Sequence, residues 1–172
     1  MGARRRAGGA RAAPTLTGVL DLRAARLDDP DALALVDEVQ RYYVELYGGE
    51  DEDPLSAEEF APPRGGFLLG YEDGAAVAMG GWSRREAVPE EAKIRRMYVR
   101  PAGRRRGHAG ALLDALEADA ASSGVVRTVL TTGTPQADAV LFYRARGYAD
   151  VEPFGHYAAS PAAVHLGKPL TR

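Results

Sequence analysis

Residues 104–110 read RRRGHAG, which places three arginines and a glycine directly before a helical pattern. The first turn of a helix exposes backbone N–H groups without partners in the helix, and the helix dipole is positive there. A glycine lets the backbone approach a ligand without a Cβ in the way, and arginines add charge and forked donors. The stretch therefore predicts a pyrophosphate site, with a solvated charge run as the simpler alternative.

Two widespread phosphate motifs do not fit the chain. No segment reads G-x-x-x-x-G-K-[ST], the phosphate loop of many NTPases. Residues 107–110 (GHAG) also lack the G-x-G-x-x-G spacing of dinucleotide-binding folds. Neither of these two nucleotide-binding classes is therefore predicted.

The segments on either side place this stretch at a junction between a strand and a helix. The preceding segment, 93–100 (KIRRMYVR), is typical of a strand and is ended by Pro101. From His108 onward, apolar residues recur on one helical face until the Ser-Ser-Gly at 122–124. The loop therefore leads directly into the N-terminus of a helix.

The rest of the chain predicts a mixed sheet with helices on both faces. A helix is expected from about Pro30 to Gly48, and another is expected to begin with Thr134 as N-cap and Pro135 as first residue. The glycine pair at 80–81 suggests a bulge or a close backbone approach. A short helix is expected from Ser56, and strands are expected at 20–27, 67–71, 75–84, 93–100, 125–133, 149–153 and 163–168.

Length and charge favour one globular domain. The chain has 172 residues and a formal charge of −2, and residues 1–18 are expected to form a disordered basic arm before a domain at 19–172. Taking the arm's four arginines from the 22 basic residues leaves 18 against 24 acidic residues, so the body is acidic at −6. This makes nucleic acid a poor match in charge, although Arg4–Arg6 and Arg104–Arg106 keep it as an alternative.

Some chemistry and some locations are excluded or disfavoured by composition. The chain has no cysteine, which excludes disulfides, thiolate metal sites and a cysteine nucleophile. It has no apolar run long enough to cross a bilayer and no convincing secretory signal, so a cytoplasmic protein without a membrane partner is expected.

Two segments carry a family resemblance. MYVRPAGRRRGHAGALLDALEADA resembles the acyl-CoA-binding motif of the GNAT superfamily of N-acyltransferases, which reads Gln/Arg-x-x-Gly-x-Gly/Ala between a strand and a helix and is filled here by residues 104–109. AVLFYRARGY (139–148) resembles a second family signature, an alanine four residues before a tyrosine, then glycine and an aromatic residue. The expected order of elements from Leu20 to Leu170 is also similar to that family.

The resemblance implies an α/β (α+β) GNAT fold, with a mixed, mostly antiparallel central sheet of six to seven strands. It implies acetyl-CoA as co-substrate and no metal. The strand after the motif helix, 125–131, would splay from the preceding strand and leave a gap. CoA would contact the backbone of one strand, the amides of the phosphate loop and one residue of the next helix: Met97, Tyr98, Val99, Arg104, Arg105, Arg106, Gly107, His108, Ala109, Gly110 and Gln136.

The resemblance also implies two proton-transfer roles. Tyr143 is similar to the family tyrosine that faces the CoA sulfur, and a phenol suits a leaving thiolate; a core aromatic is the alternative. Many relatives carry a glutamate where Lys93 stands here. Glu91 lies on the same strand face as Lys93 and becomes the candidate base through water, with a solvated strand end as its alternative.

The acceptor is less defined by the sequence. The acidic stretch Glu50–Asp53 favours a cationic amine, with a solvated loop as the alternative. The resemblance implies an acceptor wall at His156 and Tyr157, and Tyr42, Tyr43 and Tyr47 are candidates for the opposite wall, with plain packing as the alternative for each. The predicted activity is acetyl transfer from acetyl-CoA to a primary amine of a small molecule or peptide by direct attack. A catalytically impaired acyl-CoA-binding sensor is the alternative, and a homodimer is left open.

Overall fold

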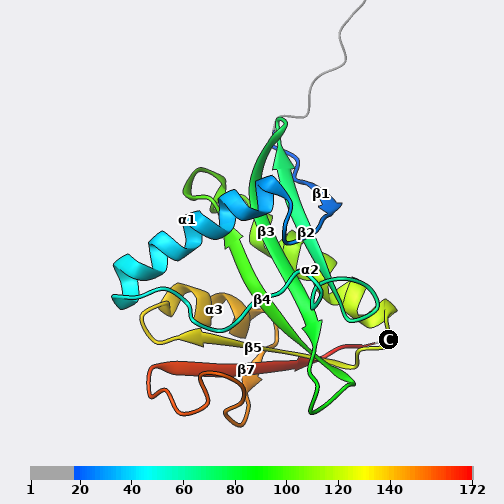
Figure 1. Cartoon of the computed structure of the whole chain (residues 1–172), viewed down its shortest axis with the longest axis vertical. Helices are drawn as coiled ribbons and strands as arrows, with labels where there is room; N and C mark the ends of the chain where they lie inside the picture. Colours follow the sequence, from blue (N-terminus) through cyan, green and yellow to red (C-terminus); the bar gives the residue numbers. More distant parts are fainter. Residues whose placement is uncertain (1–17, 172) are drawn as a thin grey trace, which may run out of the picture.

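The computed structural model describes residues 18–171, so the predicted basic arm lies almost entirely outside the described residues. These residues form a seven-stranded sheet in the order β1-β2-β3-β4-β5-β7-β6 (Figure 1). Three α-helices and one 3₁₀ turn accompany it. The elements are β1 (Asp21–Ala24), α1 (Pro30–Tyr47), β2 (Gly65–Glu72), β3 (Ala75–Arg84), β4 (Glu91–Val99), η1 (Pro101–Gly103), α2 (His108–Ser122), β5 (Arg127–Gly133), α3 (Ala137–Ala145), β6 (Ala149–Asp150) and β7 (Ala163–Pro169). The expected mixed α/β fold is confirmed.

One junction in the sheet is parallel, and it separates early. All neighbouring strands pair antiparallel except β4 and β5. Their pairs run only from Glu91 with Arg127 to Lys93 with Val129, after which the two strands diverge, as Figure 1 shows. The divergence expected from the resemblance is therefore confirmed, and it leaves the C-terminal half of β4 beside open space.

The sheet has a hydrophobic core on each face. On one face, α1 packs against β2 and β3 through a cluster that includes Leu35, Val39 and Met79. On the other face, α2 and α3 pack through a cluster that includes Leu112, Leu116 and Tyr143. Helices cover both faces because neighbouring residues of the central strands alternate between the two clusters.

The glycine pair in β3 lies opposite a bulge. Between the pairs Met79–Tyr98 and Gly81–Arg95, the register advances by two residues on β3 and by three on β4. The extra residue is therefore on β4, where Arg96 adopts a left-handed φ of 55°. A bulge bends its strand and interrupts pairing, and here it does so next to the divergence from β5.

Several expected boundaries are wrong. Residues 57–60 form turns rather than a helix. Helix α3 begins at Ala137 with Gln136 as N-cap, because Thr134 and Pro135 lie in a turn closed by the bond from Gln136 N to Gly133 O at 2.9 Å. The strand expected at 149–153 is only Ala149–Asp150, and the first strand is only Asp21–Ala24.

Within residues 18–171, no helix has the length and apolar character needed to span a bilayer.

Candidate active site

The RRRGHAG stretch forms a turn that leaves the first amides of α2 open. Gly107 is the N-cap with a φ of 80°, and no side chain caps this helix end. A left-handed φ costs a residue with a Cβ about 1–2 kcal/mol, which explains the glycine. The N–H groups of His108, Ala109 and Gly110 are therefore available to an anion, as the sequence predicts.

A groove of about 630 Å³ runs along this turn, between β4, α1 and α3. Its wall holds every residue predicted to contact CoA except Arg106. They are Met97, Tyr98, Val99, Arg104, Arg105, Gly107, His108, Ala109, Gly110, Gln136 and Tyr143. Residues separated by up to 46 positions are thus brought to one surface by the strand–turn–helix junction and the start of α3.

The arginines of the turn have different surroundings. Arg104 donates from Nε to the Val99 carbonyl at 3.1 Å and lies 6.0 Å from the Tyr98 ring centroid. Arg106 instead pairs with Glu72 at the end of β2, at 2.5 Å. The Arg106 side chain therefore lies outside the groove wall, and its predicted contact with CoA through the backbone amide stays a prediction.

The His108 imidazole also contacts Glu72. Its Nε2 lies 2.8 Å from Glu72 Oε2, and its side chain is only 3% exposed. The pKa of Glu72 is lowered, mainly by the hydrogen bond to His108 and to a smaller extent by the charge of Arg106. Desolvation of the carboxylate acts in the opposite direction. The imidazole thus anchors the turn to β2, and only the backbone N–H of His108 is offered to the groove.

A smaller cavity of about 110 Å³, here named the throat, lies where β4 and β5 diverge. Its wall is formed mainly by residues 93–97 of β4 and 130–132 of β5. Tyr143 from α3 lines both the throat and the groove. Burial, with a smaller contribution from Tyr43, raises the pKa of the Tyr143 phenol above its usual 10, so the group stays protonated as a donor.

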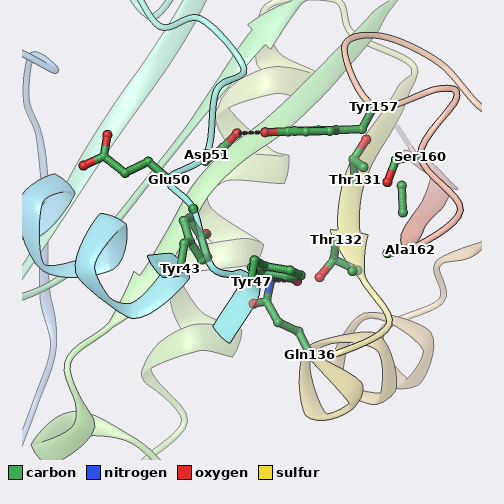
Figure 2. Close-up of a pocket in the computed structure, with 13 residues that line it drawn as sticks. Tyr43, Tyr47, Glu50, Asp51, Thr131, Thr132, Gln136, Tyr157, Ser160 and Ala162 are labelled. Atoms are coloured by element: carbon green, nitrogen blue, oxygen red, sulfur yellow. Dashed lines mark hydrogen bonds between the residues drawn. The ribbon is translucent and has the colours of Figure 1, made fainter. Parts of the chain in front are cut away.

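An inner pocket of about 250 Å³ lies beyond the throat. Figure 2 shows Tyr43 and Tyr47 of α1 opposite Thr131 and Thr132 of β5. Tyr157 closes one side, where its hydroxyl donates to Asp51 at 2.6 Å (Figure 2). The same hydroxyl accepts from the Glu52 N–H at 2.9 Å. These two bonds tie the loop after β6 to the loop after α1.

The three spaces are connected. Tyr43 and Gln136 line the groove, the throat and the inner pocket. Gln136 also donates from Nε2 to the Tyr47 hydroxyl at 2.7 Å, which links the start of α3 to the end of α1. A ligand that enters along the groove and a second that occupies the pocket would therefore meet in the throat.

The cations of β4 near the throat are matched by acidic residues of the 50–59 segment. Lys93 contacts Asp53 at 2.5 Å, and Arg95 contacts Asp53 at 3.0 Å. Arg96 pairs with Asp51. Of the predicted acidic stretch, Asp51 lines the inner pocket with its carboxylate bonded, whereas the Glu50 carboxylate points away from the other pocket residues in Figure 2.

Glu91, the predicted base, lies outside the site. It is at the paired end of β4, where its carboxylate contacts Arg85 and, at 2.9 Å, Arg127. It is absent from the walls of the groove, throat and inner pocket. Glu91 lies two residues before Lys93, where β4 is still paired with β5, and the two arginines hold its carboxylate there, so sharing a strand face with Lys93 does not bring it to the throat.

Comparison with known proteins identifies the family. The sequence profile described as Acetyltransferase (GNAT) family matches residues 32–148. The chain belongs to the GNAT family. This GNAT chain is also similar to a protein of Azospirillum brasilense named IAA acetyltransferase, with 32% identity over 139 residues that cover 79% of this chain and 88% of the relative.

Solved structures agree on the fold of the GNAT chain. A Klebsiella pneumoniae protein, proposed to be an acyl-CoA N-acyltransferase, has a TM-score of 0.76 and 25% identity over 90% of this chain and 100% of its own. An N-acetyltransferase of Thermoplasma acidophilum, solved with coenzyme A, has a TM-score of 0.65 and 16% identity over 88% and 99%. The protein is therefore an acyltransferase with a GNAT fold, from a family that uses acetyl-CoA.

Proposed function

We propose that this GNAT protein transfers an acetyl group from acetyl-CoA to the primary amine of a small molecule by direct attack. The observation that carries the proposal is the connected passage from the uncapped turn at Gly107, through the throat, to the inner pocket. The passage brings a donor site and an acceptor site together at one point. Acetyl transfer in a complex of both substrates requires this arrangement.

The groove fits the chemistry of CoA. Open amides of the first turn of α2 and the nearby Arg104 and Arg105 suit a diphosphate. From there the groove follows β4 at Met97–Val99, beyond the last pair with β5. A strand edge without a partner, such as the edge of β4 that faces β5 here, can hydrogen-bond an extended amide chain such as pantetheine. Acetyl-CoA bound in this way supplies the acetyl group as a thioester.

Tyr143 is the residue that we assign to the leaving group. Its side chain lines both the groove and the throat, where the thioester would end. Burial raises its pKa, which keeps the hydroxyl protonated and able to donate to the sulfur. No metal is required for this step.

The inner pocket supports a small cationic amine as acceptor. Its volume of about 250 Å³ suits a compact molecule, and three tyrosines supply aromatic surface near Asp51. Tyrosine faces attract ammonium groups, whereas the Asp51 carboxylate is already paired with Arg96. IAA, named for the Azospirillum relative, is a further compound to include in an acceptor screen.

Tyr157→Phe tests the acceptor pocket. Loss of the hydroxyl removes the bonds to Asp51 and to the Glu52 N–H. At about 1 kcal/mol per bond, or about 2 kcal/mol for both, the KM of the acceptor should rise about 30-fold, while the KM of acetyl-CoA stays unchanged. Tyr71→Phe is the matched control, because it removes a hydroxyl bonded to Asp31 at 2.8 Å, at an exposed position outside the passage. A rise in the KM of acetyl-CoA in Tyr157→Phe would contradict the assignment.

The activity itself is tested by thiol release from acetyl-CoA with a panel of acceptors: 2-phenylethylamine, spermidine, IAA and a short peptide with a free N-terminus. Turnover with at least one primary amine is expected, together with saturable acetyl-CoA binding in calorimetry. Acetyl-CoA binding without turnover by any amine would reject the proposed reaction. Failure of acetyl-CoA to bind at millimolar concentration would reject the donor site as well.

One observation favours a second candidate, an acyl-CoA-binding module without catalysis. Lys93 stands where many relatives carry a glutamate, and its ammonium is held by Asp53, so β4 offers no free carboxylate at that position. Such a module would bind acetyl-CoA with no amine-dependent thiol release. The panel above separates the two candidates.

Glu91→Gln tests whether Glu91 acts as a base. We expect kcat to change less than about twofold, because Glu91 lies outside the passage. The free energy of unfolding should fall by about 1–3 kcal/mol, since Arg85 and Arg127 lose their carboxylate partner. Thermal melting and steady-state kinetics measure both. A large loss of kcat with an unchanged melting temperature would restore Glu91 as the base.

A further inference from the structure

Given the proposed function, the geometry points to a proton relay from the acceptor amine through the Thr131 hydroxyl to His165. Thr131 is the catalytic residue of this relay, because it would touch the amine. His165 acts through Thr131. The relay supplies the base that Glu91 does not provide.

The two residues are held together by the sheet. Thr131 of β5 and His165 of β7 are directly paired across the two strands. Thr131 Oγ1 lies 3.2 Å from His165 Nδ1, within hydrogen-bond distance. Because both side chains stand on neighbouring strands in one register, little motion is needed to keep this contact.

Thr131 lies where the amine would react. It lines both the throat and the inner pocket, so its side chain borders the path between acceptor and thioester. Met97 and Tyr143 line the same throat from β4 and α3. An amine in the throat would therefore have Tyr143 and Thr131 among its neighbours.

His165 has an unexplained polar atom. The residue is only 6% exposed, and its Nε2 has no hydrogen-bond partner within residues 18–171. A buried ring nitrogen without a partner is costly and is retained in proteins mainly for a reason other than packing. A side chain that gains and loses a proton during each reaction cycle provides such a reason.

The surroundings keep this imidazole neutral. Burial lowers the pKa of His165 below its usual 6.5 against the opposing effect of a hydrogen bond with the Tyr157 backbone, and the charge of Lys93 on β4 lowers it further. The Phe154 ring lies 5.1 Å from the imidazole, with Lys93 and Arg85 over that ring at 5.8 and 4.5 Å. Because Lys93 is paired with Asp53, a transient charge on His165 would not meet an unpaired ammonium.

The transfer balances in bonds and protons. The bond between nitrogen and the acetyl carbon forms, and the bond between that carbon and sulfur breaks. One ammonium proton passes to Thr131 Oγ1 while the Thr131 hydroxyl hydrogen passes to His165 Nδ1. Tyr143 donates its hydroxyl proton to the leaving sulfur. After the new bond has formed, the nitrogen loses a second proton, and this proton restores the Tyr143 hydroxyl. His165 returns its proton to water, so the residues end unchanged.

Four variants test the relay with the amine that turns over fastest among 2-phenylethylamine, spermidine and the peptide. Thr131→Val and His165→Gln should lower kcat/KM for that amine about 100-fold, the lower end of the contribution of general base catalysis. Thr131→Ser keeps the hydroxyl and should retain most of the activity. His156→Gln serves as the matched control, because His156 is exposed and lines neither the groove, the throat nor the inner pocket.

The pH profile separates a relay from a structural role. Between about pH 5 and pH 9, the unsubstituted protein should lose kcat/KM as His165 protonates below pH 6.5, and Thr131→Val and His165→Gln should lack that inflection. If His165→Gln unfolds, the comparison of Thr131→Val with Thr131→Ser tests the relay without it. Normal activity and an unchanged profile in Thr131→Val would overturn the relay alone. Absence of turnover by the unsubstituted protein would overturn the proposed function, and the relay with it.

Discussion

Replacing Tyr143 with phenylalanine is expected to lower kcat for amine acetylation about 100-fold, with little change in the affinity for acetyl-CoA. General acid catalysis contributes about 10²- to 10⁴-fold in enzymes, and the variant removes only the donor hydroxyl. The ring itself should stay in place, because it packs edge-on against Phe142 and Tyr148 at centroid distances of 5.1 and 5.5 Å. Steady-state kinetics and calorimetry with acetyl-CoA measure the two quantities.

Tyr148→Phe is the matched control for that experiment. It also removes a buried hydroxyl, but one that donates to Glu117 and contacts Thr128, each at 2.9 Å. Tyr148 lines none of the three spaces of the passage, so its loss should lower the melting temperature and leave kcat nearly unchanged. If both variants lowered kcat equally, the role assigned to Tyr143 would be structural.

Gly107→Ala should weaken acetyl-CoA binding about tenfold or more. At a φ of 80° an alanine is strained by about 1–2 kcal/mol, and relief of that strain turns the first amides of α2 away from the groove. The added methyl group would meet no atom within 4 Å, so the effect comes from the backbone and not from a clash. The Kd from calorimetry measures it.

Gly124→Ala gives the same strain in another place. Gly124 has a φ of 87°, a Cβ added there would meet no atom within 4 Å, and the residue follows α2 outside the passage. The variant should lower stability about as much as Gly107→Ala and leave the Kd of acetyl-CoA unchanged. Equal Kd values in the two variants would show that the Gly107 backbone does not hold the diphosphate.

The donor side of the site could be predicted from the sequence, because its signals are local. The turn at Gly107 and the helix after it lie within a few residues of one another, and a glycine before a helix with arginines beside it has a direct physical interpretation. The divergence of β4 from β5 was implied by the family resemblance, and the pairing that ends at Lys93 confirms it.

The acceptor side could not be predicted, because it depends on contacts between residues far apart in the chain. Asp51 meets Arg96 and Tyr157, which are 45 and 106 positions away. Thr131 meets His165 only once β5 and β7 are paired in register. Glu91 lies outside the throat because β4 is still paired with β5 at that position and because Arg85 and Arg127, from other parts of the chain, hold its carboxylate. The pairing of the Arg106 side chain with Glu72 of β2 likewise depends on a residue far away in the chain.

The central claim is that the open amides at the start of α2 hold the CoA diphosphate while the acyl end lies beside Met97 and Tyr143. A titration of ¹⁵N-labelled protein with CoA, followed by NMR, tests this most directly. We expect saturable shifts of the His108, Ala109 and Gly110 amides, together with those of Met97–Val99. Shifts confined to other surfaces, or no shift at millimolar CoA, would contradict it.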